Sequence, residues 1–445
     1  MRFILFSLVV FNLIRTQVVY SVEVPEALKN LQLHAIQAAP NADLTLSSIA
    51  QSLPLQPSEG NQWILPKGIY KGNFVIDVPI YLRCEDGAVF DADGQKNALN
   101  IRAPEVTLEN CEVTHFGKNL TNMDSGIFIE RTAKKTTLKN NFIHGPGFGV
   151  WVDATEGVHI LNNKIQGDNS LRTQDRGNGI HLFAVRKALI QGNELWHVRD
   201  GIYIETSNDN VFDNNYLHDM RYGIHYMFSN RNSVTNNLTR RTRTGYTLMQ
   251  SRQLTVLNNR SEYDDNYGIL MNYITYSTIK NNYVTNVQAG QGDGVHIQGG
   301  EGKGVFIYNS LFNEISDNYF ANSAIGIHLT AGSEDNKIYK NAFVNNQMQV
   351  KYVAVRYQEW SVDGVGNYWS DYLGWDRNND GIGDIPYEPN DNIDKLLWNY
   401  PQVRLLMNSP SIELLRLVQR VFPVVKYPGV QDSFPLMHYR EKDSQ

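Results

Sequence analysis

Short apolar segments recur along the chain at nearly constant intervals. A glycine followed by an apolar residue, a variable residue and a second apolar residue occurs nine times between residues 126 and 329. Alternation over so few residues predicts short β-strands, and intervals of about 22 residues are too short for propeller blades. The successive spacings are 23, 30, 22, 22, 22, 23, 26 and 32 residues. The glycines are Gly126, Gly149, Gly179, Gly201, Gly223, Gly245, Gly268, Gly294 and Gly326.

A second column of polar residues repeats in phase with these glycines. Its members are Asn140–Asn141, Asn162–Asn163, Gly192–Asn193, Asn214–Asn215, Asn236–Asn237, Asn258–Asn259, Asn281–Asn282, Asp317–Asn318 and Lys340–Asn341. Two columns with one period predict an all-β, right-handed, single-stranded parallel β-helix with coils of about 22 residues, in which the asparagines stack through their side-chain amides. The longer intervals place insertions near residues 168–178, 288–293 and 299–310.

The coils begin close to residue 61. The segment from Ile64 to Tyr70 resembles the opening coils of pectin-lyase-like β-helices. We therefore expect a lead-in and cap at 22–60, the β-helix at 61–355, a loop region at 356–408, and a helical and extended tail at 409–445.

The outward face of the repeated strand carries the candidate chemistry. Side chains alternate across a strand, so the variable residue after each glycine and the residue two positions later face outward, about 4.8 Å from their counterparts on the next coil. His225, Met227 and Met249 then converge around one small ion, and His296 meets His328 across neighbouring coils. Imidazole and thioether ligands suit Cu(I), which predicts a copper site; the alternative is a ladder of rings that only stack.

Composition agrees with this architecture. The chain has 445 residues, 47 of them asparagine and 34 glycine, with 24 tyrosines and 18 phenylalanines. Asparagine disfavours helices and tolerates left-handed turns, so a helix bundle is excluded. The net charge of −6 does not suggest a nucleic-acid binder, because such proteins normally show a basic face.

The N-terminus predicts export. Met1 and Arg2 precede an apolar run to Ile14, and residues 19–21 offer a cleavage site, so residues 1–21 are interpreted as a signal peptide. Cys84 and Cys111 match no metal or redox motif. We expect two buried thiols, with one disulfide as the alternative, because exported proteins are often oxidised.

The C-terminal region contains two further motifs. Asp376, Asn378, Asp380 and Asp384 occupy the spacing of calcium ligands in an EF-hand-like loop, with Gly381 at its turn, although Tyr387 stands where a bidentate acid is required. Ser409–Pro410 then predicts the start of a helix that ends before Pro423. Its apolar stripe predicts either a cap on the β-helix or a docking surface for a membrane partner. The stripe comprises Ile412, Leu415, Val418 and Phe422.

Taken together, the coils and the run from Gly366–Asn367–Tyr368–Trp369 to Asp384 resemble the NosD family of periplasmic nitrous oxide reductase maturation proteins, over roughly residues 60–440. This resemblance implies a non-enzymatic periplasmic subunit on the permease and ATPase of an ABC transporter. It also implies a part in copper delivery to the copper–sulfur cluster of the reductase, with a copper chaperone lipoprotein as donor. The helix and tail would then contact the permease. No family motif assigns the copper ligands.

A polysaccharide lyase or epimerase is the competing class, and a carbohydrate-binding β-helix is a third. Such enzymes need neighbouring carboxylates on one outward face. Here Glu130, Asp153 and Glu205 are scattered over separate coils, which disfavours the enzyme.

Overall fold

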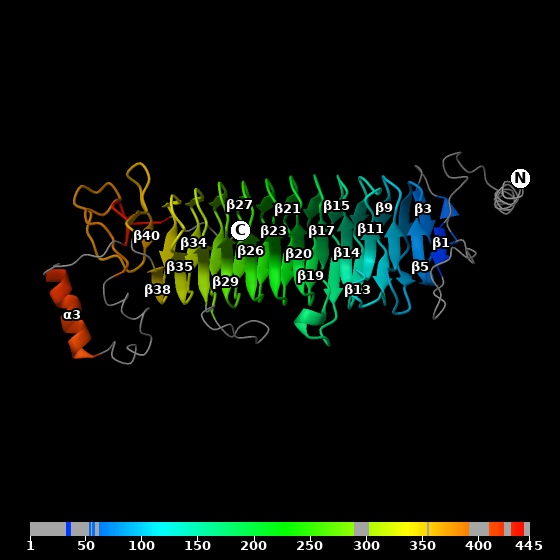
Figure 1. Cartoon of the computed structure of the whole chain (residues 1–445), viewed down its shortest axis with the longest axis horizontal. Helices are drawn as coiled ribbons and strands as arrows, with labels where there is room; N and C mark the ends of the chain where they lie inside the picture. The colour runs from blue at the N-terminus through cyan, green and yellow to red at the C-terminus, as the bar shows by residue number, and fades with distance from the viewer. Residues whose placement is uncertain are drawn as a thin grey trace, which may run out of the picture.

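The computed structural model describes residues 33–36, 53–54, 56–57, 62–288, 302–353, 356–390, 409–421 and 429–439. The predicted signal peptide and most of the lead-in lie outside these residues. Over the described chain, the repeats form a parallel β-helix whose coils stack along one long axis (Figure 1).

Three sheets run the length of the described stack, and each coil contributes one strand to each sheet in the order B, C, A. Neighbouring strands are parallel, except that β1 and β2 pair antiparallel with β5 and β3. Sheet A contains β1 (Leu33–Ile36), β5 (Asn73–Ile76), β8 (Leu99–Ile101), β11 (Ser125–Ile129), β14 (Phe148–Asp153), β17 (Ile180–Phe183), β20 (Asp200–Glu205), β23 (Tyr222–Met227), β26 (Thr244–Met249), β29 (Tyr267–Asn272), β32 (Lys303–Tyr308), β35 (Ile325–Thr330) and β38 (Met348–Val353).

The other two sheets consist mostly of three-residue strands. Sheet B contains β2 (Gln56–Pro57), β3 (Gln62–Leu65), β6 (Tyr81–Cys84), β9 (Thr107–Glu109), β12 (Thr137–Lys139), β15 (His159–Leu161), β18 (Leu189–Gln191), β21 (Val211–Asp213), β24 (Ser233–Thr235), β27 (Thr255–Leu257), β30 (Thr278–Lys280), β33 (Glu314–Ser316) and β36 (Lys337–Tyr339). Sheet C contains β4 (Gly68–Lys71), β7 (Ala88–Asp91), β10 (Glu112–Thr114), β13 (Phe142–Gly145), β16 (Lys164–Gly167), β19 (Glu194–Trp196), β22 (Tyr216–His218), β25 (Leu238–Arg240), β28 (Arg260–Glu262), β31 (Tyr283–Thr285), β34 (Tyr319–Ala321), β37 (Ala342–Val344) and β40 (Tyr368–Trp369).

The bore of the helix is filled by the apolar residues of the repeat. Ile202 and Ile204 of β20, for example, have no exposed surface, and each pairs in register with its counterpart on the neighbouring coils. Truncating such a side chain to alanine costs about 2–5 kcal/mol. These buried apolar columns therefore align and stabilise the stack.

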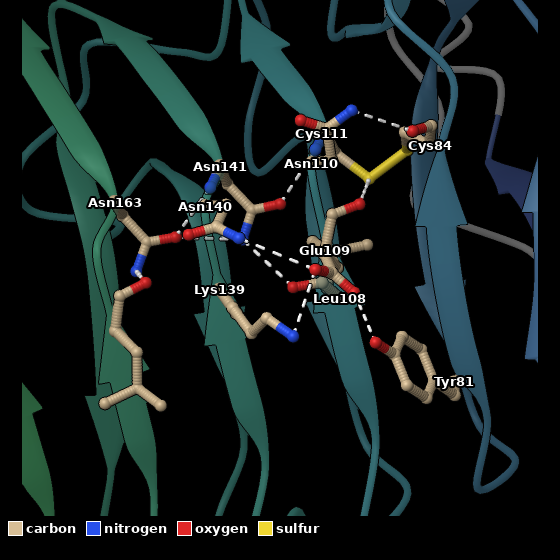
Figure 2. Close-up of polar contacts among 11 residues, drawn as sticks. Tyr81, Cys84, Leu108, Glu109, Asn110, Cys111, Lys139, Asn140, Asn141 and Asn163 are labelled. Carbon is tan, nitrogen blue, oxygen red and sulfur yellow. Dashed lines mark hydrogen bonds and ion pairs between the residues drawn. A yellow bond between two sulfur atoms is a disulfide. The ribbon is translucent and has the colours of Figure 1, made fainter.

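The predicted asparagine stack is confirmed. The second asparagine of each pair is buried and donates its side-chain N–H to the amide oxygen of the next coil, as Asn141 does to Asn163 at 2.9 Å (Figure 2). The first member has a left-handed backbone, with φ of 54° at Asn140, which asparagine tolerates well. The stack comprises Asn141, Asn163, Asn193, Asn215, Asn237, Asn259, Asn282, Asn318, Asn341 and Asn367.

The preferred cysteine prediction, two free thiols, was wrong, and its alternative, one disulfide between two buried residues, is confirmed. Cys84 and Cys111 form a disulfide that joins adjacent coils near the N-terminal end of the stack, with their Cα atoms 5.0 Å apart (Figure 2). A separation of 27 residues is close to one coil, so it brings both residues to the same corner of the helix. The expectation of free thiols did not take this consequence of the coil period into account.

One coil was also placed wrongly. The coil after β29 contains Gly304 rather than Gly294, and Gly304 precedes Gly326 by 326 − 304 = 22 residues. Two segments match the repeat pattern here, Gly294–Val–His–Ile and Gly304–Val–Phe–Ile, and only the second restores the period. The insertion predicted at 299–310 is therefore wrong, since residues 303–308 form β32. The insertion predicted at 168–178 is confirmed and contains a single turn of 3-10 helix, η3 (Thr173–Asp175).

The C-terminal end of the stack is closed by a segment from far along the chain. Strands β39 (Gln358–Glu359) and β41 (Val430–Gln431) pair in parallel. Asp432, which is fully buried, accepts hydrogen bonds from the backbone N–H of Asn367 and the indole N–H of Trp369, at 2.7 and 2.8 Å. A Cβ atom at Gly366 would lie 1.7 Å from the Asp432 carboxylate. The Gly–Asn–Tyr–Trp motif thus seats this closing carboxylate.

Candidate functional site

The outward column of sheet A is a ladder of rings along the coils. Trp151 stacks on His181 with ring centroids 3.8 Å apart, and His181, Tyr203 and His225 follow at 4.7 Å intervals. The strand register aligns these residues directly. The described column is Phe128, Trp151, His181, Tyr203, His225, Thr247, Leu270, Phe306 and His328.

Although the ladder faces outward, its histidines are buried by their neighbours. His181, His225 and His328 expose only 7%, 7% and 9% of their surface. Burial lowers the pKa of His181 to about 3 and that of His328 also to about 3. These two rings are therefore neutral near pH 7, the form in which an imidazole nitrogen has a free lone pair.

His225 has a different partner from the other two. Its Nδ1 lies 2.9 Å from Asp200 Oδ2, and Asp200 in turn accepts two hydrogen bonds from Arg221, at 2.7 and 2.6 Å. Burial acts to raise the pKa of Asp200, but the hydrogen bonds from His225 and Arg221 outweigh it and lower that pKa below its ordinary value. We call Asp200, Arg221 and His225 the buried triad.

Several buried polar atoms on this face have no hydrogen-bond partner in the described chain. They include His181 Nε2, His225 Nε2 and Thr247 Oγ1, all on residues at most 7% exposed. Buried polar groups in proteins are normally paired, so each unpaired one needs an explanation. A carboxylate only accepts hydrogen bonds, so Nδ1 of His225 carries the hydrogen toward Asp200, and a neutral ring then keeps its lone pair on Nε2.

The predicted methionine ligands lie on the same face. Met227 follows His225 by two residues on β23, in register with Glu205, and Met249 ends β26 in register with Asn272. Both side chains are half-buried. The residue directly beside His225 on β26 is Thr247. The grouping of His225, Met227 and Met249 around one copper ion stays a prediction.

In the column, the position beside His328 that was predicted for His296 belongs to another residue, Phe306. The strand that pairs with β35 is β32, and its outward residue beside His328 is Phe306, with ring centroids 4.8 Å apart. His296 lies outside the described residues. Among the described residues, no three His, Cys, Asp or Glu side chains are placed to hold a metal ion together.

The predicted calcium loop has its carboxylates turned toward its own backbone. Asp376 accepts hydrogen bonds from the N–H groups of Asn379 and Gly381, and Asp384 accepts one from Arg377. The Asn378 amide donates to Asp380. These contacts fold the loop, and calcium binding by Asp376, Asn378, Asp380 and Asp384 stays a prediction.

A second triad of the same composition lies at the corner after sheet C. Asp219 accepts hydrogen bonds from Arg241, at 2.8 and 2.8 Å, and lies 2.6 Å from Nδ1 of His218. Burial alone would raise the pKa of Asp219, but the hydrogen bonds from Arg241 and His218 lower it to about 2. The other ring nitrogen of His218 lies 3.6 Å from Glu194. We call Asp219, Arg241 and His218 the outer triad.

The predicted docking helix is α3 (Pro410–Val421), which stands apart from the coils at the C-terminal end (Figure 1). Ser409 caps it by accepting a hydrogen bond from the Ile412 N–H. Ile412 is buried, whereas Leu415 and Val418 are 51% and 45% exposed. Phe422 lies outside the described residues. The exposed side also carries Leu414 and Leu417.

Comparison with known proteins then identifies the family. The family model described as "Periplasmic copper-binding protein (NosD)" matches residues 161–374, and one described as "Right handed beta helix region" matches residues 80–171. The chain is 62% identical over 405 residues, 91% of each chain, to the Stutzerimonas stutzeri protein named "Probable ABC transporter binding protein NosD". The chain belongs to the NosD family. A Pseudomonas aeruginosa relative of the same name is 60% identical over 86% of this chain and 90% of its own.

The NosD relatives are named as binding proteins of a transporter, not as enzymes. Solved structures similar to this chain include the Streptococcus pneumoniae adhesin PfbA, with TM-score 0.49, 10% identity, and coverage of 65% of this chain and 91% of that one. A mannuronic acid specific polysaccharide family 6 lyase has TM-score 0.46 and 13% identity, over 69% of this chain and 80% of that one. Both TM-scores are below 0.5, so neither likeness bears on function. In the described parts of this NosD chain, no helix has the length and hydrophobicity that crossing a bilayer requires.

Asp200 and Arg221 were not predicted from the sequence. Asp200 directly precedes Gly201, and Arg221 lies two residues before Gly223. At the same places other coils carry Asn178, Tyr222 and Arg199. The only sequence signal for Asp200 and Arg221 is their position just before a repeat glycine. Strand alternation does not indicate that residues at those positions contact the outward column.

Proposed function

We propose that this chain is a periplasmic accessory protein of nitrous oxide reductase maturation, which works on the permease and ATPase of an ABC transporter and takes part in copper delivery. The periplasmic copper-binding description of the family and the transporter names of its relatives support this role. A copper chaperone lipoprotein would supply the ion, and the copper–sulfur cluster of the reductase would receive it.

The observation that carries the copper role is the unpaired Nε2 of His225. A buried imidazole nitrogen with a lone pair, on the strand that ends in Met227 and beside the strand that ends in Met249, offers soft ligands without a full coordination shell. Such a partial set suits an ion that is received and passed on. The exposed side of α3, with Leu415 and Val418, would contact the permease.

An anaerobic Cu(I) titration of residues 22–445 against a colorimetric chelator tests the copper role. We expect about one bound ion, lost in the His225→Ala/Met227→Ala/Met249→Ala variant and retained in His218→Ala, which disrupts the outer triad instead. Cu(I) binding that survives the triple variant would move the site elsewhere, to the His296 segment or His328. A chain that binds no Cu(I) under any condition would contradict copper carriage. Docking onto the transporter would then be the remaining proposed role.

A further inference from the structure

Three kinds of contact hold the ring of His225 in place. Nδ1 lies 2.9 Å from Asp200 Oδ2, and the ring packs edge-on against Tyr203 and Tyr222, at centroid distances of 4.7 and 5.0 Å. These three contacts come from two adjacent coils, since Asp200 and Tyr203 are on β20 and Tyr222 is on β23. The ring orientation is therefore set before any ligand binds.

The carboxylate of Asp200 is itself held in place. Arg221 donates two hydrogen bonds to its two oxygens, at 2.7 and 2.6 Å, and the guanidinium lies over the ring of Tyr222 at 4.4 Å. Asp200 exposes 1% of its surface. A two-point arginine–carboxylate contact fixes both the position and the rotation of the carboxylate. Oδ2 consequently lies at one defined place relative to His225.

We infer that Asp200 and Arg221 are positioning residues, which fix His225 in the tautomer with hydrogen on Nδ1 and so make Nε2 the atom that meets copper. The inference rests on the proposed copper role of His225. Metal-binding histidines commonly donate their second ring N–H to a carboxylate, and loss of that partner typically costs 10- to 100-fold in metal affinity. Here the carboxylate is that of Asp200, which Arg221 orients.

A measurement without copper tests the tautomer directly. In 15N-histidine-labelled chain, the ring signals missing from the His225→Gln spectrum belong to His225. We expect a hydrogen on Nδ1 and none on Nε2 in the neutral ring, and in Asp200→Asn a shift toward the other tautomer. A protonated Nε2 in the parent chain, or an unchanged ring in Asp200→Asn, would overturn the inference.

Copper affinity supplies the second test. We expect Asp200→Asn to weaken Cu(I) binding about 10- to 100-fold and Asp219→Asn, the matched change in the outer triad, to leave it unaltered. If Asp200→Asn does not fold, Arg221→Lys keeps the charge and loses the two-point contact, and we expect a loss of several-fold. If these variants keep full Cu(I) affinity while His225→Ala loses it, the positioning role is rejected and the proposed copper site is retained. Full affinity in His225→Ala would reject the proposed copper site, while the NMR result would stand separately.

Discussion

Two carboxylates in this chain each hold one arginine and one histidine, in different surroundings. In the buried triad, the side chains of Asp200 and Arg221 are 1% and 19% exposed. In the outer triad, the side chains of Asp219 and Arg241 are 28% and 44% exposed. The hydrogen-bond lengths are nearly the same, so the contacts alone do not distinguish the two triads.

The difference lies in burial and in the free nitrogen of each histidine. In both triads this nitrogen has no hydrogen-bond partner, but in the outer triad it lies 3.6 Å from a second carboxylate, Glu194. Ion pairs at the surface contribute about 0–1 kcal/mol, and breaking a buried one costs about 3–5 kcal/mol. The same three residue types therefore stabilise a corner of the β-helix in the outer triad and orient an imidazole ring in the buried triad.

Removal of each carboxylate should separate the triads most strongly. We expect Asp200→Ala to lower the free energy of unfolding by about 3–5 kcal/mol, because Arg221 and His225 lose their buried acceptor. Asp219→Ala should lower it by about 0–1 kcal/mol, because water replaces the carboxylate. Urea unfolding followed by tryptophan fluorescence measures both, and equal losses would contradict the comparison.

Acid should act on the two regions in different pH windows. His181, beside the buried triad, has a pKa of about 3, below the ordinary 6.5, so its contribution is full above pH 6.5 and is lost as pH falls toward 3. Asp219, with a pKa of about 2, contributes fully above about pH 4 and loses its contribution as pH falls through 2. Between pH 6 and 4, the parent chain should lose about 1–3 kcal/mol more of its free energy of unfolding than His181→Gln loses.

The matched control for this experiment is Asp219→Asn, which should leave the curve unchanged between pH 6 and 4. The buried carboxyls Asp264 and Asp432 have pKa values raised by burial to about 6, so their contribution has the opposite sign and is lost as pH rises. They are common to all variants and cancel in the difference. A His181→Gln curve parallel to that of the parent would show that the ladder histidine does not titrate as proposed.

Salt should produce the smallest difference. A double-mutant cycle on Arg241 and Asp219 should give a coupling of a few tenths of a kcal/mol that falls toward zero in about 1 M NaCl, where charges are screened within about 3 Å. The same cycle on Arg221 and Asp200 should keep most of its coupling, because Asp200 is 1% exposed and buried pairs are screened much less. Identical salt responses would show that burial does not separate the triads.

Much of the fold could be predicted because the repeat is periodic. The coil spacing, the asparagine stack and the outward ladder all follow from columns that recur through the sequence. The misplaced coil shows the limit: Gly294 and Gly304 match the pattern equally, and pairing with β29 and β35 decides between them. The disulfide likewise depends on which corner each cysteine reaches.

The candidate site could be predicted only in part. His225 was found because it occupies a repeating position, and its partners were missed because Asp200 and Arg221 occupy variable ones. Burial was missed too, since alternation predicts that His181 and His328 face outward and says nothing of the neighbouring rings that cover them. The face of a strand on which a side chain lies follows from the local sequence, whereas the burial of that side chain depends on several coils together.

The asparagine stack has a polarity, since each side chain donates toward the C-terminal coil, and the series terminates on Asp432, 65 residues beyond Asn367. Each coil contacts mainly its neighbours, so the coils can fold one after another, beginning at the N-terminal end. The terminal acceptor is synthesised after all the coils that it closes. A chain truncated before residue 432 would therefore carry a complete stack with an open end, a defect available for recognition by proteases.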